Sequence, residues 1–331
     1  MKLERIAIVG AGGWGTALAL IWAKRGHPVL LWGNNAARVE EIRKTRENKI
    51  HLSGVTLPES VGLTSELKDC SDADLIVFVT PSTALREIAG RFHVTNKNAV
   101  LLSCVKGIEH GTGKRMSEIL AETFPDHAVA VLSGPNLAIE VSRELPTATV
   151  VACSDPTRAT ELQHHLGTPR FRIYTGEELI GIELGGALKN IFAIAAGAGD
   201  GLGLGDNSKA ALVTRSLAEM IRLGTKMGAD ARTFYGLSGA GDLVATCFSH
   251  LSRNRQVGEQ LGHGRTLPEI TSSMQTVPEG IPTAKSAYEC ARKLNIDTPV
   301  IDEVYALVHQ GKPPVRAMED LLARDQKAER G

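Results

Sequence analysis

The chain has 331 residues, with 37 Lys plus Arg and 37 Asp plus Glu, so its formal net charge at pH 7 is zero. This balance, without a Lys/Arg-rich block, argues against nucleic acid as a partner. A composition that is 43% hydrophobic and 22% charged is typical of a globular protein, and the length favours about two domains.

The first half of the chain alternates short apolar runs with longer helical patterns. Runs that are apolar throughout are typical of strands covered on both faces. Their alternation with helices predicts right-handed βαβ units and a parallel sheet. We therefore predict an α/β, Rossmann-type doubly wound sheet for residues 1–180. The expected strands are Arg5–Val9, Val29–Trp32, Leu75–Val79, Ala99–Val105, Ala128–Leu132, Ala148–Cys153 and Phe171–Tyr174, and the expected helices are Thr16–Arg25, Ala36–Arg46 and Gly113–Phe124.

Strand-like runs stop near Gly176–Leu179, which predicts a mostly α-helical domain over residues 181–331. The run Gly199–Asn207 reads as a glycine-rich loop, either one that passes close to another backbone or a ligand, or a mobile lid. The charged tail Arg324–Gly331 is expected to be frayed. The expected helices of this domain are Ile182–Ala196, Ala210–Met227, Arg253–Leu261, Thr283–Leu294 and Pro299–Val308.

A G-x-G-x-x-G motif follows the first expected strand and opens the first expected helix, which is the context of a dinucleotide-binding turn. Gly10 permits the tight turn, Gly12 lets the backbone approach a pyrophosphate, and Gly15 allows close helix–strand packing. The anion would sit on free N–H groups at the helix N-terminus. The alternative is a glycine-rich turn without a ligand. Gly13 and Trp14 complete the motif.

The end of the second expected strand bears on the choice between NAD and NADP. An NAD site usually has an acidic residue about 20 residues after the glycines, to hold the ribose hydroxyls. This chain has Asn34 at that point and no acid, so nothing repels a 2′-phosphate, and Arg38 is close enough to meet one. We favour NADP slightly over NAD. Arg38 is equally well explained as a solvated helix charge.

Ligands of open parallel sheets bind outside the carboxyl ends of the strands. Polar residues follow three of these ends, at Thr80–Ser82, at Lys106-Gly107 and at Ser133–Asn136. Lys106 follows an apolar strand and is expected to point its cation into the crevice beside the cofactor. The alternative is a surface lysine in a loop.

Lys189 and Asn190 are the only strongly polar interior residues of an otherwise apolar helix. A lysine in such surroundings loses hydration, which lowers its pKa towards neutrality and makes it a candidate general acid or base. The alternatives are snorkelling of the side chain to water and a structural ion pair.

Ser252 reads as a helix N-cap that is followed by Arg253 and Asn254. A cation in a first helical turn is unfavourable to the helix dipole, so a bound phosphate would explain it. A solvated arginine is the alternative.

The scattered cysteines and histidines predict neither disulfides nor a metal site. The five cysteines form no CxxC pair, and the ten histidines show no HxxH spacing. Free thiols favour a reducing compartment, and the apolar stretches are too short for a signal segment or a membrane span. We therefore expect a cytoplasmic protein without a membrane span.

Several of these segments, in this order, resemble the bacterial NAD(P)-dependent glycerol-3-phosphate dehydrogenases along nearly the whole chain. The resemblance rests on GAGGWGTALA, Lys106-Gly107-Ile108-Glu109, Ser133-Gly134-Pro135, GALKN with DGLGLGDN, SGAGDL and SRNRQ. Gly13 stands where the family usually has Ser or Ala, and Asn136-Leu137 replaces the common Ser/Thr-Phe.

The resemblance implies a role for each matching position. It makes Lys189 the proton donor and acceptor, Lys106 the lysine that contacts the substrate beside the nicotinamide, and Asp242 the aspartate on the lysine side. The resemblance also implies substrate or cofactor contacts at Gly134, Asn136, Ala138, Ser252, Arg253, Asn254, Val277 and Glu279. From the residue patterns described above, we add Asn190 to the expected substrate contacts, and Gly13, Trp14, Asn34 and Arg38 to the expected cofactor contacts.

The activity implied by the resemblance is reversible hydride transfer between sn-glycerol 3-phosphate and dihydroxyacetone phosphate, with NAD or NADP. It would supply the glycerol phosphate backbone for phospholipid synthesis. A homodimer is implied by the resemblance alone. Two rivals are a related dehydrogenase of β-hydroxyacids or sugar acids, and a non-enzymatic dinucleotide sensor, which would need neither lysine.

Overall fold

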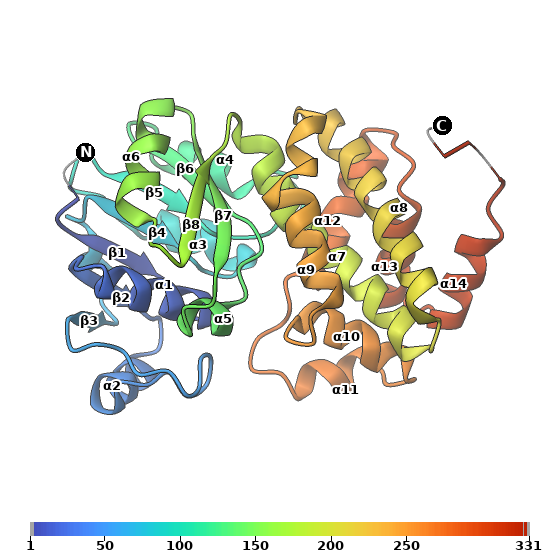
Figure 1. The fold of residues 1–331 in the computed structure, drawn as a ribbon, viewed down its shortest axis with the longest axis horizontal. Coiled ribbons are helices and arrows are strands. Elements are labelled where there is room, and N and C mark those ends of the chain that lie inside the picture. Colours follow the sequence, from blue (N-terminus) through green and yellow to red (C-terminus); the bar gives the residue numbers. More distant parts are fainter. Residues whose placement is uncertain (1–2, 327, 330–331) are drawn as a thin grey trace.

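The computed structural model describes residues 3–326 and 328–329. It consists of an eight-stranded sheet with flanking helices, followed by a helical domain, as predicted (Figure 1). Part of the tail expected to be frayed, residues 327 and 330–331, lies outside the described residues. The strands are β1 (Ile6–Val9), β2 (Val29–Trp32), β3 (Val61–Thr64), β4 (Leu75–Phe78), β5 (Val100–Ser103), β6 (Ala128–Ser133), β7 (Thr147–Cys153) and β8 (Phe171–Thr175). The helices beside them are α1 (Gly13–Lys24), α2 (Ala36–Thr45), α3 (Leu85–Gly90), α4 (Met116–Thr123), α5 (Ala138–Ser142) and α6 (Pro156–Leu166), with short turns η1 (Leu67–Cys70) and η2 (Ser82–Ala84).

The strands are arranged in the order β3-β2-β1-β4-β5-β6-β7-β8, and the first six are parallel. This is the strand order of dinucleotide-binding folds. The parallel prediction is wrong for the last two strands, because β7 runs antiparallel to β6. A parallel crossover usually needs a full helix, whereas the connection from β6 to β7 contains only the five-residue α5. The strand β3 was not predicted, because it is only four residues long and contains a glycine.

Alternate residues of the central strands enter two different cores, as the twofold period of a strand requires. Ile6 and Ile8 pack into a core shared with α1 and α6, whereas Ala7 and Val9 pack into a core shared with α3 and α4. Both faces of the sheet are therefore covered, which explains why the strand sequences are apolar throughout.

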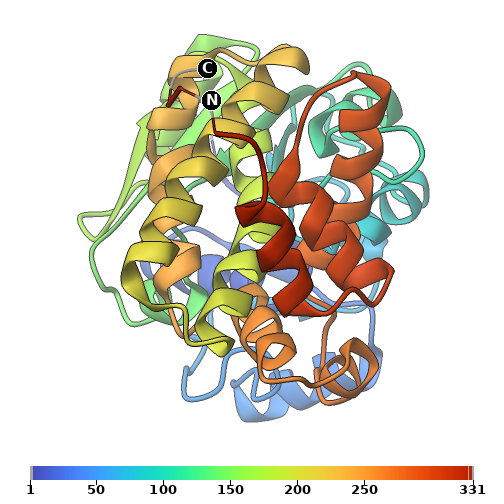
Figure 2. The ribbon, with the colours of Figure 1, turned by 90° about the vertical axis from the view of Figure 1, so that its right-hand side faces the viewer.

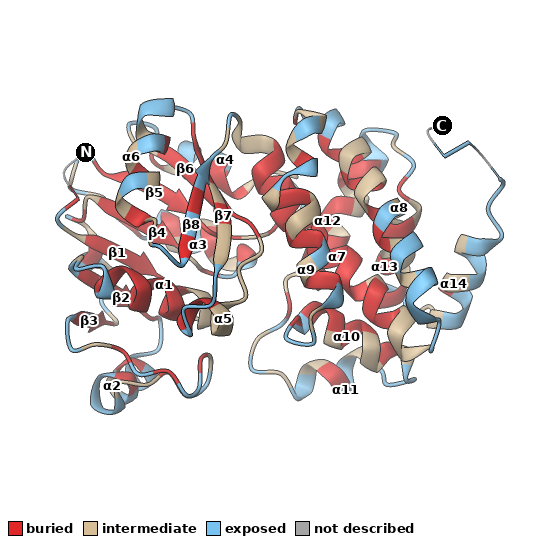
Figure 3. Ribbon diagram, viewed as in Figure 1, coloured by how far each residue is buried: buried red, intermediate tan, exposed pale blue. Residues whose placement is uncertain are grey.

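The helical domain is built around α7, a 23-residue helix whose residues are mostly buried (Figure 3). By length and composition α7 resembles a membrane span, but 83% of its most apolar window is buried, so core packing accounts for its apolar character. Helices α8, α13 and α14 lie on the outer side of this domain (Figure 2). Its elements are α7 (Leu179–Gly201), α8 (Gly205–Lys226), α9 (Asp242–Phe248), α10 (Arg253–Gly262), α11 (Leu267–Ser272), α12 (Gly280–Lys293), α13 (Pro299–His309) and α14 (Pro314–Leu322), with η3 (Ala231–Tyr235) and a π-helical turn η4 (Leu237–Gly241).

The predicted glycine-rich loop at Gly199–Asn207 is wrong, because α7 continues to Gly201 and α8 begins at Gly205. Of the glycines in this run, Gly201 lets α7 and α10 touch backbone to backbone, since a Cβ atom there would lie 2.3 Å from the Glu259 carbonyl oxygen. Glycines outside the run extend this contact. A Cβ atom on Gly197 would lie 1.9 Å from the Arg255 carbonyl oxygen, and one on Gly258 would lie 1.9 Å from the Ile194 carbonyl oxygen. The expected close approach of backbones is thus present, but between two helices.

A buried carboxylate of α7 joins the two domains. Glu183 accepts hydrogen bonds from the backbone N–H and the hydroxyl of Ser117, at 2.8 and 2.6 Å, and forms an ion pair with Arg115 at 3.0 Å. Burial raises the pKa of this carboxyl. Because Ser117 lies in the first turn of α4, the acid of one domain satisfies a free helix N–H of the other.

Candidate active site

The glycine turn between β1 and α1 has the shape of an anion cradle. Gly10 has a φ of 133°, and a Cβ atom there would lie 2.5 Å from the Val79 carbonyl oxygen. A Cβ atom on Gly15 would lie 2.0 Å from the Gly10 carbonyl oxygen, whereas one on Gly12 would meet nothing within 4 Å. Packing therefore explains two of the glycines, and open space over the N-terminus of α1 explains the third. Such a turn fits the pyrophosphate of a dinucleotide.

A segment that the sequence did not single out lies over this turn. The Asn48 side chain donates hydrogen bonds to the Ala11 carbonyl oxygen at 2.9 Å and to the Thr16 hydroxyl at 2.8 Å. The His51 carbonyl oxygen would lie 2.7 Å from a Cβ atom on Gly13. A side chain at position 13 would therefore collide with this backbone.

His51 lies between two of the predicted cofactor residues. Its pKa is lowered by burial and by the charges of Arg38 and Arg253, which come from different domains. Arg38, Asn34 and Arg253 are all exposed. His51 is part of no recognisable motif, so only its position after α2 could have suggested that it lies near the cofactor site.

The side chains of the other predicted cofactor residues have structural contacts of their own. The Trp14 ring packs against Phe171, with a centroid distance of 6.1 Å, and the Ala138 Cβ lies 3.8 Å from a Cβ position on Gly13. Val277 is 56% exposed. Half-buried Glu279 accepts hydrogen bonds from the Ser82 backbone N–H at 3.0 Å and from its hydroxyl at 2.5 Å, which ties the start of α12 to η2, the turn after β4.

Two lysines from different domains share one buried carboxylate. Lys106 Nζ lies 2.8 Å from Asp242 Oδ2, and Lys189 Nζ donates to Asp242 Oδ1. Lys189 also donates to the Thr246 hydroxyl at 2.8 Å, and Lys106 donates to the Gly134 carbonyl oxygen at 3.2 Å. The exposed fractions of the side chains are 18% for Lys106, 8% for Lys189 and 1% for Asp242. The sequence predicted the three charged residues but missed Thr246, one helical turn after the aspartate.

The electrostatics of this cluster favour a proton-transferring amine. Burial lowers the pKa of the Lys189 ammonium to about 7, an effect that Lys106 reinforces and Asp242 opposes. When both lysines are protonated, the two cations and one anion leave a net positive charge. Such a charge stabilises negative charge that develops on a substrate oxygen.

Asp242 is positioned by a local irregularity in the helical domain. It begins α9 directly after the π-helical turn η4, where a Cβ atom on Gly239 would lie 2.1 Å from the Phe234 carbonyl oxygen. A Cβ atom on Gly185 of α7 would lie 2.6 Å from the Ser238 carbonyl oxygen. The glycines of SGAGDL and GGALKN thus bring α7 and α9 close enough for Lys189 and Asp242 to meet. Turns of this kind are frequent at functional sites.

Residues after β6 line the same end of the sheet. The Asn136 side chain donates to the Thr149 hydroxyl at 3.1 Å, and its buried oxygen has no hydrogen-bond partner within the protein. The Ser133 hydroxyl is likewise buried without a partner. Gly134 has a φ of 153°, and a Cβ atom there would lie 2.9 Å from the Thr149 hydroxyl. Buried polar atoms without partners are uncommon and fit a site that receives a polar ligand.

The start of α10 has the predicted cap. The Ser252 hydroxyl accepts from the Arg255 N–H at 3.2 Å. Asn254, however, is used internally: it donates to Asn190 Oδ1 at 2.9 Å and accepts from the Gly280 N–H at 2.8 Å. The exposed side chain of Arg253 donates a hydrogen bond to the Thr276 hydroxyl at 3.1 Å. The two asparagines therefore join α7, α10 and α12 behind the site.

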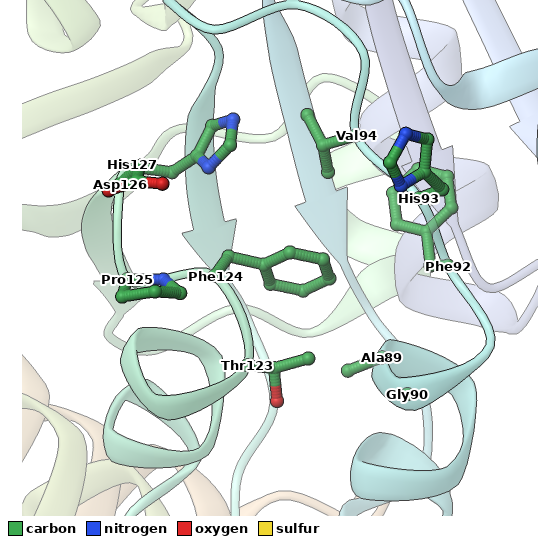
Figure 4. A pocket seen from close by; sticks show the side chains of 10 residues that line it. All are labelled: Ala89, Gly90, Phe92, His93, Val94, Thr123, Phe124, Pro125, Asp126 and His127. Carbon is green, nitrogen blue, oxygen red and sulfur yellow. The ribbon is translucent and has the colours of Figure 1, made fainter.

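A separate pocket lies at the opposite ends of the strands (Figure 4). Its walls come from the segments that precede β5 and β6, whereas Lys106 follows β5 and Ser133 is the last residue of β6. None of the predicted site residues lines it. In the described part of the chain, no group of three or more His, Cys, Asp or Glu side chains is placed to hold a metal ion. The pocket is lined by Ala89, Gly90, Phe92, His93, Val94, Thr123, Phe124, Pro125, Asp126 and His127.

Comparison with known proteins assigns both domains to one family. Residues 5–159 match the family model described as the NAD-dependent glycerol-3-phosphate dehydrogenase N-terminus, and residues 178–319 match the corresponding C-terminus. The chain is 46% identical to a glycerol-3-phosphate dehydrogenase [NAD(P)+] of Geobacter sulfurreducens, over 99% of both chains. It is also 46% identical to one of Chlorobium chlorochromatii, over 98% of this chain and 99% of the relative.

A solved structure agrees with this assignment. The crystal structure of glycerol-3-phosphate dehydrogenase from Coxiella burnetii superimposes with a TM-score of 0.93 at 36% identity, covering 97% of this chain and 99% of that one. Sequence and fold thus agree along both domains, and the chain belongs to the NAD-dependent glycerol-3-phosphate dehydrogenase family.

Proposed function

We propose that this chain is an NAD(P)-dependent sn-glycerol-3-phosphate dehydrogenase, which interconverts sn-glycerol 3-phosphate and dihydroxyacetone phosphate. The observation that carries the proposal is that Lys106 and Lys189 share one buried aspartate, Asp242. This cluster lies at the carboxyl end of β5, on the edge of the sheet that also bears the glycine turn after β1. Family membership and the names of the relatives support the same reaction. We assign residues 1–180 to the cofactor-binding domain and residues 181–331 to the domain that supplies most substrate contacts.

When bound, the nicotinamide ring supplies or accepts the hydride. The chain's own contribution is a proton and a positive potential. Lys189 gives its proton to the carbonyl oxygen during reduction and takes one from the hydroxyl during oxidation. Lys106 adds positive charge where the oxygen becomes negative, and Asp242 holds both ammonium groups in place.

The phosphate of the substrate would bind at the start of α10. Free N–H groups at the N-terminus of this ten-residue helix favour an anion, and exposed Arg253 adds a cation there. We assign Ser252 and Arg253 to this contact. Asn254 and Asn190 fix the start of α10 against α7. We also assign both residues to direct contact with the substrate, through the hydrogen-bonding groups that they do not use on each other. Gly134 and Asn136 line the other side of the substrate.

NADP remains our slightly favoured cofactor. No carboxylate occupies the end of β2, and Arg38 and Arg253 supply positive charge around His51, beside the glycine turn. Gly10, Gly12, Gly13, Trp14 and Gly15 would form the turn around the pyrophosphate, and Asn34, Ala138, Val277 and Glu279 would complete the cofactor site. Replacement of Arg38 by Ala should raise the KM for NADPH and leave that for NADH unchanged; equal changes would make Arg38 a solvated charge.

We also propose a cytoplasmic homodimer that supplies glycerol phosphate for phospholipid synthesis. The free buried cysteines and the family resemblance support this setting. Light scattering of the purified protein at several concentrations tests the dimer.

The decisive experiment follows the oxidation of NADPH and of NADH side by side, with dihydroxyacetone phosphate as substrate. We expect turnover with both cofactors and a higher kcat/KM with NADPH. A panel of 2-keto and 3-keto acids provides the comparison, because their carboxylate replaces the phosphate. Turnover of a keto acid instead would indicate a hydroxyacid dehydrogenase, and cofactor binding without turnover of any substrate would indicate a sensor.

A further inference from the structure

The loop between β5 and α4, residues 104–115, crosses from the sheet to the helical domain. We call it the clasp loop. It begins where β5 ends, carries Lys106 near its base and returns to α4 at Met116. Lys106 thus reaches the shared aspartate from a loop, whereas Lys189 reaches it from the interior of α7. A lysine has a long flexible side chain, so its position depends on how firmly the backbone that bears it is held.

The clasp loop is anchored in the helical domain by an apolar side chain. Ile108 is only 3% exposed, and it belongs to the core of the helical domain together with Leu184, Leu188 and Ala287. It is the one member of that core, among the described residues, that comes from before α7. Only Gly107 separates it from Lys106, so its burial restrains the lysine's backbone directly.

Polar contacts with α12 strengthen this anchor. His110 Nδ1 lies 3.2 Å from a carboxylate oxygen of Glu289, and Lys293 donates to the Gly111 carbonyl oxygen at 3.0 Å. A Cβ atom on Gly113 would lie 2.9 Å from the Cys290 sulfur. The tip of the clasp loop therefore lies directly on the C-terminal half of α12.

The loop is also stiff within itself. Ile108 forms a β-bridge with Arg115, and the Glu109 N–H donates to the Lys114 carbonyl oxygen at 2.9 Å. Arg86 holds the Glu109 carboxylate with two hydrogen bonds of 2.6 and 2.9 Å. A displacement of Ile108 would thus move the loop as a unit, with Lys106 at its base.

We propose that Ile108 is a positioning residue, which holds Lys106 against Asp242 by docking the clasp loop in the core of the helical domain. The inference rests on the proposed function, in which Lys106 stands beside the reacting oxygen. Because Ile108 docks in the core of the helical domain while the loop belongs to the sheet domain, the correct position of Lys106 exists only when the two domains are in contact. The competing explanation is that Ile108 only stabilises the fold.

The test is a double-mutant cycle of Ile108→Ala with Lys106→Ala, read as kcat for the reduction of dihydroxyacetone phosphate. We expect Ile108→Ala alone to lower kcat by about tenfold, since small misplacements of reacting groups are costly, with the KM for NADPH unchanged. In the Lys106→Ala background, the same substitution should change kcat less than twofold, because the group it positions is absent.

Ile301→Ala is the matched control. Ile301 of α13 is fully buried in the same core, but it is not part of the clasp loop. This variant should lower Tm as Ile108→Ala does and leave kcat unchanged. Ile108→Val should restore most of the lost kcat. If the alanine variant does not fold, Ile108→Thr takes its place in the cycle, because it keeps the branched shape and places a polar group in the apolar core.

Independent losses that multiply in the double variant would overturn the proposal, as would an unchanged kcat in Ile108→Ala or an equal loss of kcat in Ile301→Ala. An unmodified chain that does not reduce dihydroxyacetone phosphate would overturn the proposed function and this inference together. An active chain with multiplying losses would overturn the inference alone.

Discussion

The two domains contribute to the site by different physical means. The sheet domain offers backbone: a glycine turn, a helix N-terminus and strand ends, with close contacts that leave no room for Cβ atoms on Gly10 and Gly15. The helical domain offers buried charge, in the form of Lys189 and Asp242. The first half should therefore be sensitive to added volume, and the second to the loss or titration of a charge.

The largest effect should follow from removing the buried amine. Lys189→Ala should lower kcat by at least 10²-fold, in the range typical of a lost acid or base. Steady-state kinetics with dihydroxyacetone phosphate and NADPH measure this, and the dissociation constant of NADPH serves as control because it should hardly change. Near-normal turnover of the variant would exclude Lys189 as the proton donor.

An added methyl group in the glycine turn should act on binding alone. Since nothing lies within 4 Å of a Cβ atom on Gly12, Gly12→Ala should keep the parental Tm and still weaken NADPH binding by tenfold or more, about 1.4 kcal/mol. Fluorescence titration with NADPH and thermal melting together provide the measurement. Gly15→Ala is the contrasting variant, which should lose stability as well. If both variants bind NADPH normally, the turn is only a packing device.

The titration of Lys189 should give the two reaction directions opposite pH dependences. Burial lowers its pKa to about 7, so the amine loses its proton as the pH rises through 7. Reduction needs the ammonium, so its kcat should fall by up to about tenfold per pH unit above 7. Oxidation needs the neutral amine, so its kcat should rise with pH below 7 and level off above it. Profiles of kcat from pH 6 to 9 in both directions test this, and parallel profiles would contradict it.

A smaller, more selective effect is expected at the surface. Arg253→Ala should raise the KM for dihydroxyacetone phosphate by about tenfold, the order of one lost charged hydrogen bond, and change kcat little. Glycerol as substrate provides the control, because it has no phosphate. A loss of the same size with glycerol would show that Arg253 does not meet the phosphate.

The sequence predicted those parts of the molecule that depend on local patterns. The apolar runs located seven of the eight strands, the three spaced glycines identified the turn, and the isolated polar residues of an apolar helix pointed to Lys189. The roles of these residues remain predictions, whereas their placement in the fold is now known.

The features that were missed depend on contacts between distant segments. The reversed direction of β7 follows from a short connection, and the continuous α7 follows from packing of its glycines against α10, which the composition alone made look like a loop. Thr246, the Ser82–Glu279 contact and the docking of Ile108 each need two elements to be placed in space first. No pattern within one segment of the sequence predicts such contacts.

The backbone contact between α7 and α10 fixes the distance between two proposed parts of the substrate site. Lys189 lies on one of these helices and the proposed phosphate contact on the other, and the touching glycines leave neither helix free to slide or separate. The distance between the Lys189 amine and the proposed phosphate contact is therefore constant. We expect that a homologous compound with one more carbon between carbonyl and phosphate cannot reach both groups at once. Selection for substrate length then depends on the contact between the two helices, and not on any side chain that touches the substrate.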